Sequence, residues 1–496
     1  MANGHGQSGG EAAGWKARQI ADRFWKFHSE NLDDQAVTKL EYVEHVAYLL
    51  FLKLDHERSR RPSRFAASVL PAGTWPRLTD RSGDALHREL RDLMGDLGEP
   101  DRHQAPERAT ASVLFRDAQP WNVERMSELS RLIVEEIDPY QWTAVNQKEL
   151  GSAFAQLVAD CRADILGKKG TGQILTPPPV LTVLAKALDV RPGDTVVDPA
   201  GGPGSSLIAA HQVMVSHEGA IVGPDAIAAA DLDAQMCRLA TMNILLNTGR
   251  PFHQAPPVLQ ADSLKLQGVP VQRTDTTVIP TVAICNPPFR SNGVRPDSEL
   301  RDDFWAYVDY PTDFLQHIAI TLPIGARAAV FVPDGVLFGA GAVTVRENLL
   351  KNCDVHTLLR LPTGMFFGTN SKSNVLFFTK SVPRPDGAPI TRNLWVYDAR
   401  TDRHHTDTGN PVTEADFDDF LAAYRPRDAV NSREESQRFR RYPVEELLAR
   451  KDVNLNLSAH LTADLQDFGS PRDIALSIAD SLAEAQDRFR TVAESL

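Results

Sequence analysis

The chain has 496 residues and a mass of 54.7 kDa, more than one hydrophobic core usually organises, so we expect two or three domains rather than a small binding module. Hydrophobic residues make up 42% and charged residues 24%, an ordinary globular composition that excludes wholesale disorder. The 65 acidic residues outnumber the 53 basic ones, and a net charge of −12 repels a polyanion unless local basic patches or a partner hold it.

The cysteines and the N-terminus indicate a reducing compartment. The four cysteines, Cys161, Cys237, Cys285 and Cys353, are far apart and form no CxxC pair. This spacing argues against a zinc ribbon or a disulfide framework, and it predicts no metal site. Residues 1–14 contain no apolar leader, and no run of about 20 apolar residues follows, so we expect a soluble, cytoplasmic protein.

The first third of the chain is predicted to be helical. After a flexible tail over residues 1–14, apolar residues from Val43 to Leu54 recur at three- and four-residue spacing, as in an amphipathic helix, with Asp33 and Asp34 as its acidic cap. Similar patterns cover residues 123–137 and 148–166, which predicts a helical N-terminal domain over residues 15–165. Arginines at 58, 60, 61 and 64 could contact phosphate, but a solvated face is the more common role of such a run.

From about residue 172 the pattern changes to short apolar runs followed by helical stretches. Six strands are predicted, at residues 195–198, 226–231, 282–285, 328–332, 357–361 and 374–379. Strands that alternate with helices predict an α/β fold with a doubly wound, mostly parallel sheet over residues 166–400. Residues 401–496 are more polar and form an extension, in which apolar residues from Ile474 to Leu496 share one helical stripe. That stripe must pack either within this chain or on a partner.

A glycine-rich turn follows the first predicted strand. Asp198-Pro-Ala-Gly-Gly-Pro-Gly204 contains Gly201, Gly202 and Gly204, and a turn of this kind lets the backbone approach a nucleotide-like ligand at the carboxyl end of a strand. Such turns often serve only as turns, so this motif alone does not decide the function.

Two carboxylates follow the next predicted strands. Asp231 ends the second strand, where doubly wound folds commonly hold ribose hydroxyls, although an aspartate here could equally cap the next helix. Asp262 follows another short apolar stretch, where it could meet an adenine amino group or simply form a turn. Both residues are candidate ligands of a nucleoside.

The most informative motif is an apolar strand that ends in Asn286-Pro287-Pro288-Phe289. Two successive prolines lock a rigid turn. An exocyclic amine such as adenine N6 is a poor nucleophile because its lone pair is delocalised into the ring. The Asn286 side-chain oxygen and the Pro287 carbonyl can accept its two N–H bonds and aim the lone pair at a methyl group. Phe289 offers an apolar face on which an extruded base can stack.

With these motifs the sequence resembles the modification (M) subunit of type I restriction-modification systems, the N6-adenine DNA methyltransferase family. The resemblance covers most of the chain and keeps the family's motif order. It rests on Tyr48-Leu-Leu-Phe-Leu-Lys53, Gly172-Gln-Ile-Leu-Thr176-Pro177, the glycine turn, Met242-Asn243, residues 286–289, Val332-Pro-Asp-Gly-Val-Leu-Phe338 and Leu361-Pro-Thr-Gly-Met-Phe366.

The resemblance implies a Rossmann-like class I methyltransferase sheet with S-adenosylmethionine as the methyl donor. It implies cofactor contacts from Gln173, Thr176 and Pro177, in addition to the glycines and carboxylates named above. It also implies double-stranded DNA with a flipped base as substrate, a specificity (S) subunit that reads the sequence, and a restriction (R) helicase-nuclease subunit. The stripe at 474–496 is then a candidate helix for docking on the specificity subunit.

Three positions depart from the family pattern. Pro203 removes a backbone donor and a hydroxyl near the cofactor, Asp231 stands where glutamate is more usual, and Gln173-Ile-Leu-Thr176 lacks the family's aromatic pair. Two other functions stay open on the sequence. The asparagine-proline motif also serves methylation of glutamine in proteins, and the chain could be a non-catalytic scaffold of a defence complex that binds DNA or cofactor.

Overall fold

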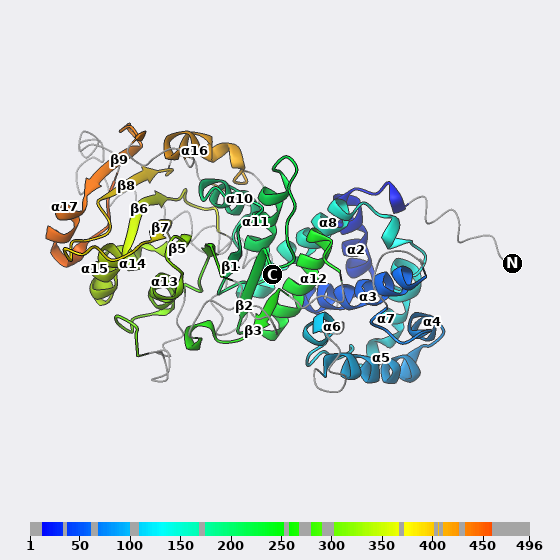
Figure 1. Ribbon diagram of the computed structural model, residues 1–496. Helices are drawn as coiled ribbons and strands as arrows, with labels where there is room; N and C mark the ends of the chain where they lie inside the picture. The colour runs from blue at the N-terminus through cyan, green and yellow to red at the C-terminus, as the bar shows by residue number, and fades with distance from the viewer. Residues whose placement is uncertain are drawn as a thin grey trace, which may run out of the picture.

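The computed structural model describes residues 12–32, 37–60, 68–99, 109–167, 174–251, 257–266, 279–289, 302–366, 372–400, 405, 410–425 and 432–458. A helical region and a sheet region lie side by side (Figure 1). Among the described helices, none is long and apolar enough to cross a membrane. Gln173 and the stripe at 474–496 lie outside the described residues.

The N-terminal region is built from helices and short helical turns. They are α2 (Ala17–Asn31), α3 (Lys39–Ser59), α4 (Thr74–Thr79), α5 (Gly83–Gly98), α6 (Ala109–Leu114), η2 (Val123–Arg125), α7 (Met126–Arg131), a π-helical turn η3 (Leu132–Ile137), η4 (Trp142–Ala144), α8 (Gln147–Asp160) and α9 (Arg162–Gly167). The described part of this region contains no strand, as predicted.

Helix α3 differs from its prediction in two ways. Its cap is not Asp33 or Asp34, which lie outside the described residues. Instead the Thr38 hydroxyl accepts from the Glu41 N–H at 3.2 Å, and the Glu41 carboxylate accepts from the Thr38 N–H at 2.9 Å. The helix is also not one-sided, because Leu40 and every residue from Tyr42 to Asp55 are buried. It is the central helix of its region, so neighbours surround it.

The described part of the sheet region contains nine strands. They are β1 (Val196–Asp198), β2 (Ile227–Asp231), β3 (Val258–Gln260), β4 (Val282–Cys285), β5 (Arg327–Pro333), β6 (Cys353–Arg360), β7 (Ser373–Lys380), β8 (Asn393–Asp398) and β9 (Phe439–Pro443). Their order is β3-β2-β1-β4-β5-β7-β6-β8-β9. The neighbours are parallel except for β5–β7, β6–β7 and β8–β9. The prediction of a mostly parallel α/β sheet is therefore confirmed, and β9 carries the sheet beyond residue 400.

Helices cover both faces of the sheet (Figure 1). One face holds α10 (Pro178–Ala187), α11 (Ser205–Val215), α12 (Ala234–Thr248) and α16 (Asp418–Tyr424). The other face holds α13 (Tyr310–Thr321), α14 (Asp334–Phe338), α15 (Val343–Asn352) and α17 (Val444–Ala449). Short 3-10 turns complete the described elements: η5 (Ser263–Lys265), η6 (Ala340–Ala342), η7 (Glu414–Phe417) and η9 (Lys451–Val453).

Helix α12 joins the two regions. Cys237, Ala240 and Ile244 face the sheet, whereas Met236, Leu239, Met242, Leu245 and Leu246 belong to the core of the N-terminal helices. The Glu44 carboxylate of α3 forms a buried ion pair with Arg238 and accepts from Gln235 Nε2 at 2.9 Å. Because the first turn of α12 follows directly after β2, the N-terminal helices are anchored next to the carboxyl end of that strand.

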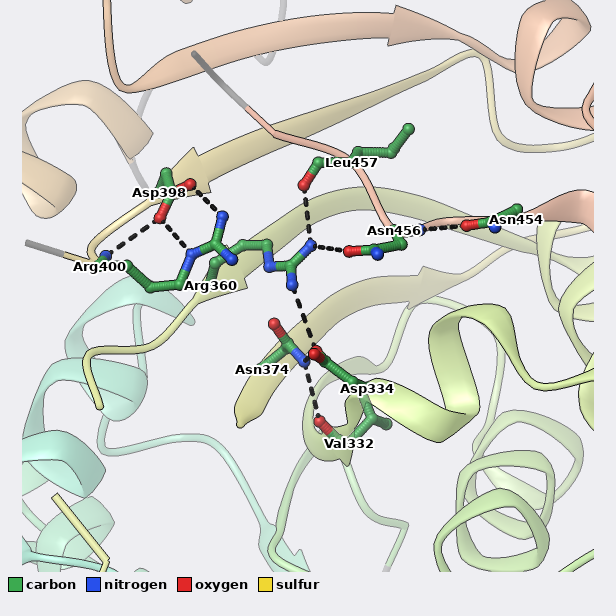
Figure 2. Close-up of polar contacts among 9 residues, drawn as sticks. All are labelled: Val332, Asp334, Arg360, Asn374, Asp398, Arg400, Asn454, Asn456 and Leu457. Atoms are coloured by element: carbon green, nitrogen blue, oxygen red, sulfur yellow. Dashed lines mark hydrogen bonds and ion pairs between the residues drawn. The ribbon is translucent and has the colours of Figure 1, made fainter. Parts of the chain in front are cut away.

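The last described segment, residues 452–458, lies against α14, and we call it the C-terminal strap. Arg346 and Arg360, two of the largest side chains that are fully buried, hold it. Arg346 donates to the carbonyls of residues 452 and 453 at 2.6 and 2.9 Å. Arg360 donates to Asn456 Oδ1 at 2.7 Å and the Leu457 carbonyl at 2.9 Å, and it pairs with Asp334 at 3.2 Å (Figure 2). The strap is thereby fixed to the residues that follow β5 and end β6.

Candidate active site at the carboxyl ends of the strands

A cavity of about 380 Å³ opens at the carboxyl ends of β1, β2 and β4. We call it the carboxyl-edge cavity. Loops that follow parallel strands meet at this edge, which is where doubly wound folds bind ligands. Eight of the residues predicted from the sequence line it: Thr176, Asp198, Gly201, Gly202, Asp231, Asp262, Asn286 and Pro288.

Four other predicted residues lie beside the cavity rather than in its wall. Gly204 caps α11 with a φ of +83°, and Pro177 precedes the first residue of α10. Pro287 is buried, and Phe289 is partly buried against the core under α10 and α11. The structure therefore places Asn286 in the cavity wall, whereas Phe289 follows closely in sequence and packs partly on the neighbouring core.

The glycine turn is shaped by close packing. A Cβ at Gly201 would lie 2.6 Å from the Ala229 Cβ, so only glycine fits there. Gly202 has a φ of +49° and open space where a Cβ would point. The Pro203 carbonyl accepts from the buried Asn243 side chain at 3.0 Å, so the turn is held although proline supplies no N–H.

Asp198 is buried beneath the turn. Its carboxylate accepts from the Ser206 hydroxyl and, at 3.0 Å, from the Ala200 N–H. Burial away from water raises the pKa of Asp198 to about 6, because desolvation disfavours the charged form. Through these two hydrogen bonds, Asp198 ties the end of β1 to the glycine turn and to the first turn of α11.

Asp231 and Asp262, the two candidate ligands of a nucleoside, line the cavity and also accept hydrogen bonds from backbone N–H groups. Asp231 accepts from the N–H groups of Gly202 at 2.8 Å and Asp233 at 2.9 Å, which ties β2 to the glycine turn. Asp233, rather than Asp231, caps α12 by accepting from the Gln235 N–H. Asp262 accepts from the Leu264 N–H at 3.2 Å, as a turn aspartate does. Both carboxylates also line the cavity, and carboxylate oxygens accept hydrogen bonds from hydroxyl and amino groups.

The Asn286 side chain is fixed in one orientation. Its amide nitrogen donates to the Ile174 carbonyl at 3.1 Å and to Thr176 Oγ1 at 2.8 Å. The amide nitrogen has two hydrogens, and these two acceptors use both of them. The amide oxygen is therefore the group left for another donor.

Sequence reasoning missed the apolar side of the cavity. Leu232, which follows β2 directly, lines the cavity and is 68% exposed. Tyr310 and Phe314, one turn apart at the start of α13, line it as well. The four-residue spacing of these aromatics puts them on one helix face, and that signal was present in the sequence.

The chemistry of this lining fits S-adenosylmethionine. Gly202 leaves room for a ligand to approach the backbone, Asp231 and Asp262 offer acceptors for hydroxyl or amino groups, and Leu232 offers an apolar surface for a base. The same cavity contains Asn286, so a cofactor and a reacting amine could meet there.

Comparison with known proteins identifies the family. Residues 109–467 match the model of the N-6 DNA Methylase family. The type I restriction enzyme StySPI methylase subunit of Salmonella potsdam is 31% identical over 430 residues, which cover 82% of this chain and 76% of that protein. The EcoKI methylase subunit of Escherichia coli strain K12 is 30% identical with the same coverage.

Solved structures share the fold. The type I restriction-modification system methyltransferase subunit from Streptococcus thermophilus matches with a TM-score of 0.69 at 20% identity, over 90% of this chain and 99% of that one. A modification subunit from Vibrio vulnificus YJ016 matches with a TM-score of 0.63 at 21% identity, over 90% and 95%. These matches confirm the class I methyltransferase sheet. The chain belongs to the N-6 DNA methylase family, among the methylase subunits of type I restriction enzymes.

Proposed function

We propose that the chain transfers the methyl group of S-adenosylmethionine to N6 of adenine in DNA, and that the reaction takes place at the carboxyl-edge cavity. Membership of the family makes it an adenine-specific DNA methyltransferase that uses this donor. The observation that supports the location best is the fixed Asn286 amide, whose oxygen is left as an acceptor beside the glycine turn.

The cofactor would be held by residues around the glycine turn. We assign Gly201, Gly202, Asp198, Asp231 and Asp262 to this role, with Gly204 and Pro177 shaping the turn and the start of α10. Leu232 is an additional candidate contact. When bound, S-adenosylmethionine supplies the methyl group as an electrophile.

Asn286 and Pro287 would orient the amine. The Asn286 oxygen accepts one N–H of adenine N6 and the Pro287 carbonyl accepts the other, which favours a lone pair directed out of the ring plane. Pro288 keeps the turn rigid, and Phe289 would stack on the extruded base. Because the amide oxygen of Asn286 is a hydrogen-bond acceptor but not a base, its contribution is orientation and electrostatic stabilisation rather than proton abstraction.

The decisive experiment measures transfer of labelled methyl from S-adenosylmethionine to unmethylated duplex DNA. The chain is assayed alone and together with the product of the neighbouring gene as the candidate specificity subunit, and N6-methyladenine is identified by mass spectrometry. We expect label in adenine when the partner is present. Label in protein, or none under either condition, would contradict the proposal.

Asn286→Ala should lower transfer by more than about 100-fold, as expected when an oriented electrostatic contact is lost. Binding of S-adenosylmethionine, measured by titration calorimetry, should change little, because the glycine turn does not depend on this side chain. Asn348→Ala on α15, outside the cavity, is the matched control. Loss of cofactor binding in Asn286→Ala would show that the amine and cofactor positions are wrongly assigned.

We further propose that a specificity subunit reads the DNA sequence and that a restriction subunit joins for cleavage. The names of the relatives support type I assembly, and the net charge of −12 favours delegating phosphate contact to a partner. The domain limits at residues 15 and 166 belong to the same proposal, with the segment at 474–496 as the docking helix. The predicted limit at 401 is too early, because β9 pairs with β8 and extends the sheet region past it.

A further inference from the structure

The segment that leads into α10 reaches the catalytic motif. Ile174 and Thr176 stand 112 and 110 residues before Asn286, yet both accept hydrogen bonds from its side-chain nitrogen. All three residues line the carboxyl-edge cavity. One contact is a backbone carbonyl, which any residue would supply, and the other is a side-chain hydroxyl, which only threonine or serine would supply here.

The two acceptors act differently on the amide. If the Asn286 amide rotated by half a turn, its oxygen would face the Ile174 carbonyl, and two acceptors would repel each other. The Thr176 hydroxyl could adapt to either orientation, because it can both donate and accept. The Ile174 carbonyl therefore selects the orientation of the Asn286 amide. The Thr176 hydroxyl accepts the second hydrogen bond, which restricts rotation of the amide group away from that orientation.

We propose that Thr176 is a positioning residue for Asn286, in addition to lining the cofactor cavity. Its hydroxyl accepts from the amide nitrogen and so fixes the amide oxygen where the reacting amine must donate. The inference rests on the proposed function for its effect on rate, but the hydrogen bond itself exists in the free protein. The hydroxyl's own hydrogen stays available to a third group at the cavity.

The effect of removing the hydroxyl should appear in the rate. Thr176→Val keeps the shape of the side chain and loses one hydrogen bond, and an interaction of about 1.4 kcal/mol corresponds to a tenfold change. We expect kcat at saturating cofactor and DNA to fall about tenfold, while Kd for S-adenosylmethionine changes by less than about threefold. Thr176→Ser restores the acceptor and should recover most of kcat.

Controls separate positioning from cofactor binding. Thr182→Val, on the exposed side of α10 where the hydroxyl bonds only its own helix at 3.2 Å, makes the same chemical change away from the cavity and should alter neither constant. A Thr176→Val protein with an unchanged kcat would overturn the inference, as would a raised Kd for S-adenosylmethionine with normal kcat at saturation. The second result would make Thr176 a cofactor contact alone.

A measurement on the free protein tests the inference even if wild-type protein transfers no methyl to DNA. With selective ¹⁵N-asparagine labelling, the Asn286 side-chain resonances are identified by their absence in Asn286→Ala. We expect slow hydrogen exchange in the wild type and in Thr176→Ser, and at least tenfold faster exchange of one proton in Thr176→Val. Equal exchange in all three would refute the positioning contact, whereas an inactive wild type with the expected exchange would refute only the proposed function.

Discussion

At the scale of single residues, Asp313 is a carboxylic acid whose pKa is raised by burial. It lies in the first turn of α13, is fully buried, and its Oδ1 accepts from the Val308 N–H at 3.2 Å and from Gln316 Nε2 at 2.9 Å. Burial raises the pKa of Asp313 from 3.8 to about 7, and the nearby Asp309 charge acts in the same direction. The folded protein therefore binds a proton here that the unfolded chain has lost above about pH 4.

This shift predicts a dependence of stability on pH. Between about pH 4 and 7 the folded state binds more protons than the unfolded state, so the contribution of Asp313 falls as pH rises and is lost fully above 7. Asp313→Asn removes the titration. Its free energy of unfolding relative to wild type should rise between pH 5 and 8 by about 2–3 kcal/mol, because about two pH units of this window lie between the pKa values of the unfolded and folded states.

Urea unfolding at both pH values measures this difference. Asp386→Asn, on an exposed turn, is the matched control and should leave the wild-type pH profile unchanged. If the profiles of Asp313→Asn and wild type run parallel, the group does not titrate in this range.

At the scale of elements, α12 is shared by the two regions, because it contributes buried side chains to both of their cores. It fills the core of the N-terminal helices on one side and covers the sheet on the other. Its buried ion pair with α3 is reinforced by the Arg116 carbonyl, which accepts from Arg238 at 2.9 Å. The pair thus stabilises the junction between the two regions.

Breaking this pair should be costly. Glu44→Ala leaves the Arg238 charge buried without its carboxylate, and such losses amount to about 3–5 kcal/mol. Glu30→Ala breaks the exposed pair with Lys26 in α2, and we expect at most about 0.5 kcal/mol from it. Chemical denaturation measures the free energy of unfolding of both variants. Equal decreases would show that the buried pair between α3 and α12 stabilises the protein no more than an exposed pair does.

Six of the nine described strands were predicted, including the three-residue β1. The sequence reading missed β3, β8 and β9, although β8 has a continuous apolar run from Leu394 to Tyr397. β4 was predicted at its observed limits, because four buried residues end at a proline turn. β9 was missed because Arg440 and Arg441 interrupt its pattern, as suits an edge strand. The insertion of β7 between β5 and β6 is set by tertiary pairing and leaves no mark on local sequence.

The candidate site was predictable where residues end parallel strands. Asp198 and Asp231 are the last residues of β1 and β2, Asn286 directly follows β4, and parallel topology brings such positions to one edge. The hydrogen bonds from Asn286 to Ile174 and Thr176 were not predictable. They join residues more than 100 positions apart, and only the tertiary fold brings these residues together. The N-cap of α3 was also predicted wrongly, because aspartate and threonine are both favoured at this position and the sequence does not distinguish Asp33 or Asp34 from Thr38.

At the scale of the whole molecule, assembly should depend on the end of the chain. We expect deletion of residues 472–496 to impair complex formation with the specificity subunit while cofactor binding is kept, because the cavity is built from residues 174–314. Size exclusion with the partner and titration with S-adenosylmethionine measure the two properties. Unchanged assembly would defeat the docking proposal.

The C-terminal strap sets a limit on distance that applies to any such partner. Arg346 and Arg360 fix the chain as far as Leu457, and residues 459–473 can span at most about 50 Å at roughly 3.5 Å per residue. A partner that binds residues 474–496 is therefore held within about 50 Å of the end of β6. Tethering of this kind corresponds to a local concentration on the order of millimolar, so contacts between partner-bound DNA and the catalytic edge with a Kd below that value would be mostly occupied.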